Sequence, residues 1–177
     1  RPKIAFLNPE LTYSLPDYIT SCGVVDIFSH VLERYFSPNQ EIGVMDYLCE
    51  GIMKNLLKYG PKVRENPKSY ENRSEIMWTG TIAHNDTCGL GRIQDWGSHM
   101  IAHEISALYD TAHGATLSII IPSWMRYVYK QDKNRFARYA VSVFGVEYDP
   151  NNLDVVALEG IERTENFFKK MHTPAHS

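Results

Sequence analysis

Residues 15–36, with the sequence LPDYITSCGVVDIFSHVLERYF, predict a helix that carries an apolar face. Val24, Phe28 and Val31 recur at the three- and four-residue spacing of one helical face. Leu15-Pro16-Asp17 suits the first turn, because proline is tolerated there and an acidic side chain favours the positive end of the helix dipole. We therefore expect a long, half-apolar helix at the centre of the fold.

Helical periodicity recurs through the rest of the chain and predicts an all-α fold. The glycine-rich stretch at 87–97, TCGLGRIQDWG, is typical of a loop. We expect Gly60-Pro61 to end the second helix and Pro122 to kink or divide the fifth. Only Ile4, Phe6 and Leu7 look strand-like. The other expected helices cover about 42–59, 74–86, 98–108, 113 onward, 132–144 and 153–171.

The composition indicates one globular domain, which we place at residues 1–177. The chain is 44% hydrophobic and 22% charged, and its formal net charge is −3. This size supports one hydrophobic core, and the charge argues against a nucleic-acid-binding surface. The longest apolar run, 117–122, is too short to span a bilayer. Cys22, Cys49 and Cys88 lack C-x-x-C spacing, so we expect reduced core thiols and a cytoplasmic location.

Asp26 and His30 are the first candidate metal ligands. They lie four residues apart in GVVDIFSHVLE, so their side chains share one face of the expected helix. Apolar residues flank Asp26 on both sides, which predicts a carboxylate facing the interior. Burying an unpaired carboxylate is costly, and a metal ion would offset that cost. A hydrogen bond to another helix is the alternative.

Three more histidines extend this pattern. His99 and His103 lie four apart in DWGSHMIAHE, and His113 follows ten residues later in DTAHGATL. Spacing leaves open whether His99 and His103 both bind a metal, or whether one binds and the other assists. His113 begins a helix, so a capping or turn role is its alternative. One carboxylate with neutral imidazoles suits a divalent transition metal such as iron or zinc.

The sequence does not match other catalytic motifs, because each lacks a required residue at the required spacing. His103-Glu104 would begin H-E-x-x-H, but Ala107 occupies the second histidine position. Gly89-Leu90-Gly91 lacks the third glycine of a dinucleotide-binding turn, because that position is Gln94. His84 follows an apolar stretch, and we interpret it as structural. A mononuclear site of aspartate and histidine remains.

Two segments resemble the iron-containing (group III) alcohol dehydrogenases, closest to their NADPH-dependent butanol dehydrogenase and aldehyde reductase branch. They are LPDYITSCGVVDIFSHVLERYFS at 15–37 and SHMIAHEISALYDTAHGATLSIIIPSWMRY at 98–127. The resemblance implies the multi-helical, metal-binding C-terminal domain of the dehydroquinate synthase-like type. It also implies that the N-terminal dinucleotide-binding domain of the family is absent from this chain, which would be a fragment of a larger protein.

The resemblance implies that Asp26, His30, His99 and His113 are the metal ligands. His103 is then a nearby catalytic residue that relays a proton or contacts the substrate. The implied metal is Fe²⁺, alternatively Zn²⁺, and the implied cofactor of the intact protein is NADP(H) or NAD(H). The implied reaction is hydride transfer between the nicotinamide and a primary alcohol or aldehyde. The resemblance also implies that the intact protein is a homodimer. We expect this chain to be inactive alone.

Two other functions stay open. A helical module with a structural ion would have a closed site made of protein ligands alone. A zinc-dependent relative acting on polyols or sugar phosphates would need a basic side chain near the site, and Arg92 is the candidate. Apolar residues near the candidate ligands instead favour a small, apolar aldehyde as the substrate. These residues are Phe28, Met100, Ile101 and Trp124.

Overall fold

The protein is all-α, as expected, in a computed structural model that describes residues 3–38, 43–171 and 173. No strand occurs within those ranges. Seven α-helices are α1 (Asp17–Tyr35), α2 (Gly43–Glu65), α3 (Tyr70–His84), α4 (Gly97–Tyr109), α5 (His113–Val128), α6 (Lys133–Phe144) and α7 (Leu153–Lys170). Short 3₁₀ turns are η1 (Pro9–Thr12), η2 (Thr87–Gly89) and η3 (Tyr129–Gln131).

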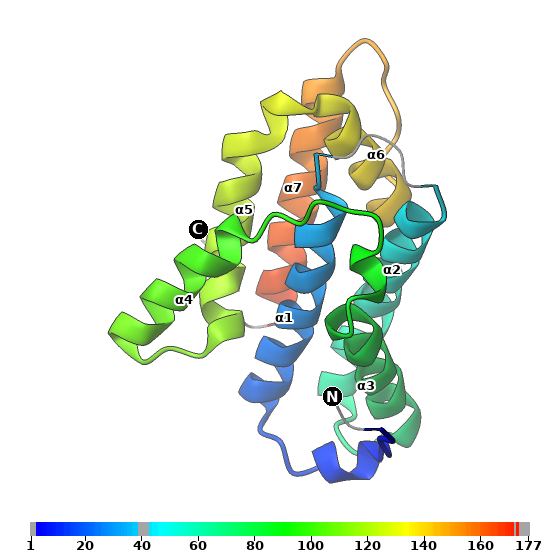
Figure 1. Cartoon of the computed structure of the whole chain (residues 1–177), viewed down its shortest axis with the longest axis vertical. Coiled ribbons are helices and arrows are strands. Elements are labelled where there is room, and N and C mark those ends of the chain that lie inside the picture. Colours follow the sequence, from blue (N-terminus) through cyan, green and yellow to red (C-terminus); the bar gives the residue numbers. More distant parts are fainter. Residues whose placement is uncertain (1–2, 39–42, 172, 174–177) are drawn as a thin grey trace.

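Helix α1 runs through the middle of the molecule (Figure 1) and packs against α2, α3 and α5. Its predicted apolar face is confirmed, because Val24, Phe28 and Val31 are completely buried. The Phe28 ring packs 5.3 Å and 5.8 Å, between ring centroids, from Phe167 and Phe168 of α7. A helix surrounded in this way has its side chains held by neighbours on several sides, which makes it a rigid base for a site.

A buried ionic cluster joins the C-terminal end of α1 to α2 and α6. The Asp46 carboxylate of α2 accepts hydrogen bonds from Arg92 and Arg135, the latter at 2.7 Å between Nη1 and Oδ2. Arg135 also donates to the Tyr35 carbonyl oxygen at 2.7 Å and 2.9 Å, which satisfies an acceptor at the end of α1. Burial alone would raise the pKa of Asp46, but the hydrogen bonds from both arginines lower it to about 2.

The expected end of the second helix is wrong, because α2 does not end at Gly60-Pro61 but continues to Glu65. Pro122 lies inside α5 and does not divide it. A proline inside a helix removes one backbone hydrogen bond and costs about 3 kcal/mol. Packing offsets this cost in α2, since Val63 is completely buried and Arg64 pairs with Asp17 of α1 at 2.7 Å.

The expected N-terminal strand is also absent from the described residues. Residues 4–8 have no regular structure, and the side chains of Ile4 and Phe6 are 75% and 93% exposed. A strand needs a neighbouring strand for its backbone hydrogen bonds, and the described part of the chain contains no strand that could provide them. The expected helix start at Ile42 lies outside the described residues. No helix in the described part of the chain combines the length and apolarity needed to cross a membrane.

Candidate metal centre

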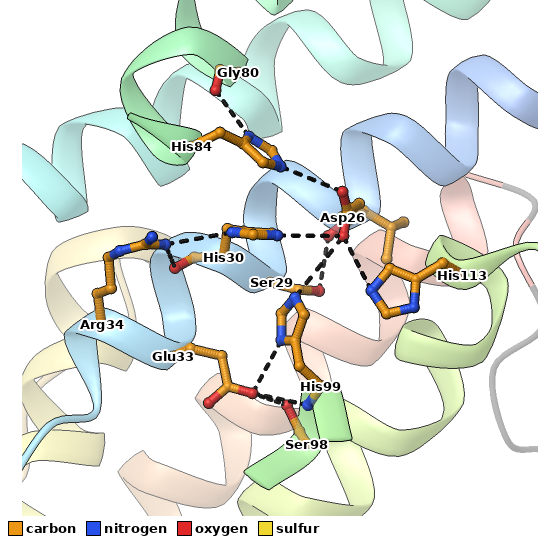
Figure 2. Close-up of polar contacts among 11 residues, drawn as sticks. Asp26, Ser29, His30, Glu33, Arg34, Gly80, His84, Ser98, His99 and His113 are labelled. Carbon is orange, nitrogen blue, oxygen red and sulfur yellow. Dashed lines mark hydrogen bonds and ion pairs between the residues drawn. The ribbon is translucent and has the colours of Figure 1, made fainter. Parts of the chain in front are cut away.

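Asp26 projects from the middle of α1 into a space bordered by α3, α4 and α5 (Figure 2). Its neighbours Val25 and Ile27 are buried, and its own side chain is 26% exposed. The Oδ1 atom is fully shielded and has no hydrogen-bond partner among the described residues. A buried carboxylate oxygen in this state is costly unless a cation neutralises it.

Three imidazoles point their Nε2 atoms at this same oxygen (Figure 2). The distances from Asp26 Oδ1 are 3.8 Å for His30, 3.8 Å for His99 and 3.5 Å for His113. Two ligand atoms that each lie about 2.1 Å from a tetrahedral ion are about 3.4 Å apart. The observed separations are close to that value. The Nε2 atom of His99, like Asp26 Oδ1, is buried and without a hydrogen-bond partner in the described chain.

The electrostatics of the centre favour an ionised Asp26 and neutral imidazoles at His30 and His113. Burial chiefly lowers the pKa of His30, to about 3, and the neighbouring His84 adds to this effect. Burial also lowers the pKa of His113. Burial alone would raise the pKa of Asp26, but the imidazoles of His84 and His99 beside it hold that pKa well below its usual range. Only a neutral imidazole has a free lone pair for a metal, so this distribution suits metal binding.

Glu33 orients His99 and was not identified from the sequence. Its Oε1 atom lies 3.1 Å from both the Nδ1 atom and the backbone nitrogen of His99, and it also accepts from the Ser98 hydroxyl. An Nδ1–H donated to this buried carboxylate leaves the Nε2 lone pair facing Asp26, as in many carboxylate–histidine–metal sites. Burial alone would lower the pKa of His99, but the neighbouring carboxylates of Asp26 and Glu33 raise it overall. The sequence spacing could have identified Glu33, because it lies seven residues after Asp26 and therefore on the same face of the helix.

Gly114 allows His113 to approach the centre. A Cβ atom at this position would lie 2.1 Å from the carbonyl oxygen of Cys22 in α1. The backbones of α1 and α5 therefore touch at the first turn of α5. Only glycine permits this contact, which holds His113 within reach of Asp26.

His103 and His84 lie at the edge of the centre. His103 is exposed one turn after His99, and its ring centroid is 4.6 Å from that of His113. Of the two histidines that spacing left undecided, the structure therefore directs His99 toward Asp26 and leaves His103 beside it. His84, interpreted above as structural, places its Nε2 atom 3.4 Å from Asp26 Oδ2.

A pocket of about 340 Å³ opens beside Asp26 and His84, between α1, α3 and η1. Its other lining residues are mostly apolar and include Leu15, Ile19, Ile27, Ile76 and Met77. The apolar neighbours expected from the sequence are different. Phe28 is buried in the core, Met100 and Ile101 are exposed on α4, and Trp124 packs near Phe36. None of the four lines this pocket.

Arg92, the expected phosphate contact of the sugar-phosphate alternative, is directed elsewhere. Its side chain is buried, and it donates to Asp46 and, at 3.1 Å, to the carbonyl oxygen of Arg34. A guanidinium held in this way is not available to a substrate phosphate at the centre.

Comparison with known proteins gives consistent matches. Residues 20–176 match the model of the Fe-containing alcohol dehydrogenase family, C-terminal part. NADH-dependent butanol dehydrogenase A of Clostridium acetobutylicum is 35% identical over 176 residues, which are 99% of this chain and 45% of that protein. NADPH-dependent aldehyde reductase YqhD of Escherichia coli is 33% identical, with the same two coverages.

A solved structure also matches nearly the whole chain. The crystal structure of NADH-dependent butanol dehydrogenase A from Thermotoga maritima matches with a TM-score of 0.92 and 38% identity. The match covers 98% of this chain and 43% of that one. This chain therefore spans less than half the length of the relatives that it matches.

Proposed function

The chain belongs to the iron-containing alcohol dehydrogenase family, as its C-terminal part, and from this premise we propose that it supplies the metal-binding half of an alcohol dehydrogenase or aldehyde reductase. The observation that carries the proposal is the convergence of three imidazole Nε2 atoms on Asp26 Oδ1, at 3.5–3.8 Å. On this proposal residues 1–177 form one metal-binding domain, and the dinucleotide-binding domain is a separate part of the intact protein.

The proposed ligands are Asp26, His30, His99 and His113, and the proposed ion is Fe²⁺, with Zn²⁺ as the alternative. Two of the donor atoms, Asp26 Oδ1 and His99 Nε2, are buried without a partner in the described chain, as unfilled ligand positions would be. When bound, such an ion acts as a Lewis acid that polarises a carbonyl and lowers the pKa of an alcohol.

The surrounding residues would orient the ligands and move the proton. Glu33 holds the His99 ring so that Nε2 faces inward. His103 lies at the exposed edge, where it can pass a proton between the substrate oxygen and solvent. The apolar pocket beside Asp26 and His84 suits the alkyl chain of a small alcohol or aldehyde.

The hydride donor or acceptor would be a nicotinamide dinucleotide, either NAD(H) or NADP(H). The names of the relatives include both, since the butanol dehydrogenases are NADH-dependent and YqhD is NADPH-dependent. We further propose a homodimeric, cytoplasmic protein. Its three cysteines are free and buried, as we expected, which suits a reducing compartment.

The alternative of a structural ion is less well supported. A closed site would bury all of its ligands, yet the side chains of Asp26 and His113 are 26% and 30% exposed. The centre is therefore open on one side, as a site that admits a substrate must be.

The first test is the metal content of the purified protein after reconstitution with Fe²⁺ without oxygen. We expect about one ion per chain, and loss of the ion in Asp26→Ala because the central donor is removed. Equal metal content in Asp26→Ala would contradict the ligand assignment.

A second test addresses the reaction. We expect the protein that contains the dinucleotide-binding domain to reduce butanal with NADH or NADPH, and this chain alone to show no turnover. Appreciable turnover by this chain alone would contradict the division of the active site between two domains.

A further inference from the structure

We propose that Trp96 is a positioning residue of the metal centre, whose indole ring fixes the imidazoles of His30 and His99 relative to each other. The proposal rests on the metal centre proposed above. Trp96 lies near the end of the glycine-rich segment 87–97, directly before α4, and is not itself a ligand.

Helix α4, which carries His99, is attached to the bundle mainly on one side. Among the described helices it packs extensively only against α5, and it projects away from the others (Figure 1). Helix α1, which carries Asp26 and His30, is therefore not held against α4 by a broad contact of the two backbones. The position of His99 relative to His30 depends instead on side chains that bridge the two helices.

The indole ring of Trp96 is such a bridge. Its centroid lies 5.1 Å from that of the His30 ring and 4.9 Å from that of the His99 ring, with interplanar angles of 69° and 85°. These are the edge-to-face arrangements that aromatic rings prefer. The two imidazoles are themselves 4.7 Å apart at 82°. The three rings contact one another pairwise, so an imidazole that tilts must also displace the indole.

Arg34 holds the indole ring from the side of α1. The Cζ atom of its guanidinium lies 4.7 Å from the centroid of Trp96, within the range of a cation–π interaction. Arg34 is fixed in turn, because its Nη1 atom donates to the carbonyl oxygen of His30 at 2.8 Å and its side chain is only 6% exposed. The indole is therefore tied to the same turn of α1 that presents His30.

The backbone around Trp96 is anchored as well. Four residues earlier, the buried side chain of Arg92 donates to the carbonyl oxygen of Arg34 at 3.1 Å, which ties the segment to the end of α1. The carbonyl oxygen of Trp96 accepts from the backbone nitrogen of Met100 at 2.9 Å, in the first turn of α4. A residue fixed in this way can hold ligands in position before the ion arrives.

Trp96 and Glu33 constrain the centre differently. Glu33 binds the Nδ1 atom of His99 and determines which nitrogen faces inward, whereas Trp96 limits the tilt of the ring. No carboxylate is hydrogen-bonded to the Nδ1 atom of His30 in the described part of the chain. The orientation of His30 therefore depends more on the rings of Trp96 and His84 that pack beside it.

The test measures Co²⁺ binding, by titration of the visible absorption bands, in variants of the purified protein. Trp96→Leu removes the ring but keeps an apolar side chain, and we expect affinity to fall roughly tenfold, as when a group that supports a ligand is lost. Trp96→Phe keeps an aromatic ring and should recover most of that affinity. Trp78→Leu is the matched control, because Trp78 is 58% exposed on α3, and it should bind like the wild type.

Tryptophan fluorescence supplies a readout that a purely structural role would not change. Paramagnetic Co²⁺ bound by two imidazoles quenches an indole that contacts both of them. We therefore expect Co²⁺ to quench part of the emission of the wild type and of Trp78→Leu, and this quenching to disappear in Trp96→Phe. The measurement needs no variant that removes the ring, so it decides the proposal even if Trp96→Leu fails to fold, which circular dichroism checks.

Two groups of outcomes are distinct. Wild-type affinity in folded Trp96→Leu, an equal loss in Trp96→Phe, or no quenching in a wild type that binds Co²⁺ would overturn the proposal about Trp96. Failure of the wild type to bind Co²⁺, or equal binding by Asp26→Ala, would instead overturn the metal centre itself.

Discussion

The contact between Gly114 and α1 leads to a prediction that links backbone packing to metal binding. In Gly114→Ala the new Cβ atom would lie 2.1 Å from the carbonyl oxygen of Cys22 and 2.6 Å from its carbonyl carbon. Both are backbone atoms inside a helix, so no side-chain rotation relieves the overlap. Ordinary contact begins at 3.4 Å, which is 1.3 Å longer than the 2.1 Å available. The first turn of α5 must therefore move away from α1.

This movement carries His113 away from the centre. Its Nε2 atom now lies 3.5 Å from Asp26 Oδ1, and metal–ligand distances tolerate changes of only about 0.2 Å. A displacement of the order of 1 Å thus removes His113 from the ligand set. We expect Gly114→Ala to weaken Fe²⁺ or Co²⁺ binding by roughly 10- to 100-fold. We also expect overpacking to lower the free energy of unfolding by about 1–3 kcal/mol.

The measurements are metal titration and urea denaturation of the purified protein. Gly51→Ala is the matched control, since this glycine lies in α2 with no atom within 4 Å of the added Cβ. It should bind metal normally and be more stable by about 0.5–1 kcal/mol, because alanine favours a helix over glycine. Wild-type metal affinity in Gly114→Ala would refute the argument that this contact positions His113.

Three further predictions follow from the surrounding residues. Glu33→Gln should keep the fold but weaken metal binding roughly 10- to 100-fold, because the His99 ring loses its anionic partner; unchanged affinity in the titration would contradict this role. His103→Ala should retain the metal, shown by elemental analysis, and slow aldehyde reduction by the intact enzyme; loss of the metal would instead make His103 a ligand. The low pKa of Asp46, about 2 against its usual 3.8, should contribute about 2 kcal/mol to the free energy of unfolding. This contribution is complete above about pH 4 and is lost as the pH falls through about 2, and denaturation across that range measures it; Asp46→Asn should remove this part of the pH dependence, and its persistence would argue against Asp46 as the source.

Some local expectations failed where packing between helices opposed the preference of single residues. Gly60-Pro61 is typical of a helix end, yet α2 continues because Val63 is buried and Arg64 pairs with Asp17. Val63 belongs to the hydrophobic core that several helices share, and Asp17 lies in α1, so the partners of these residues are distant in sequence. The sequence pattern of α2 alone contains no information about these contacts.

Residue spacing was sufficient to predict the all-α class and the placing of donors along each helix. Asp26 and His30 share a face because a helix repeats every 3.6 residues, whatever surrounds it. The same repeat would have identified Glu33. The resemblance of residues 15–37 and 98–127 to a family then indicated the set of four ligands.

Only the packing of the helices brings side chains from separate helices together around the Asp26 carboxylate. His84 reaches Asp26 across 58 residues of sequence, and no periodicity relates the two positions. Gly114 matters because two backbones touch there, a contact made between α5 and α1 rather than within either. Helical spacing depends on hydrogen bonds between near neighbours in the chain. The crossing of helices depends instead on how all their buried surfaces fit together, which no short stretch of sequence contains.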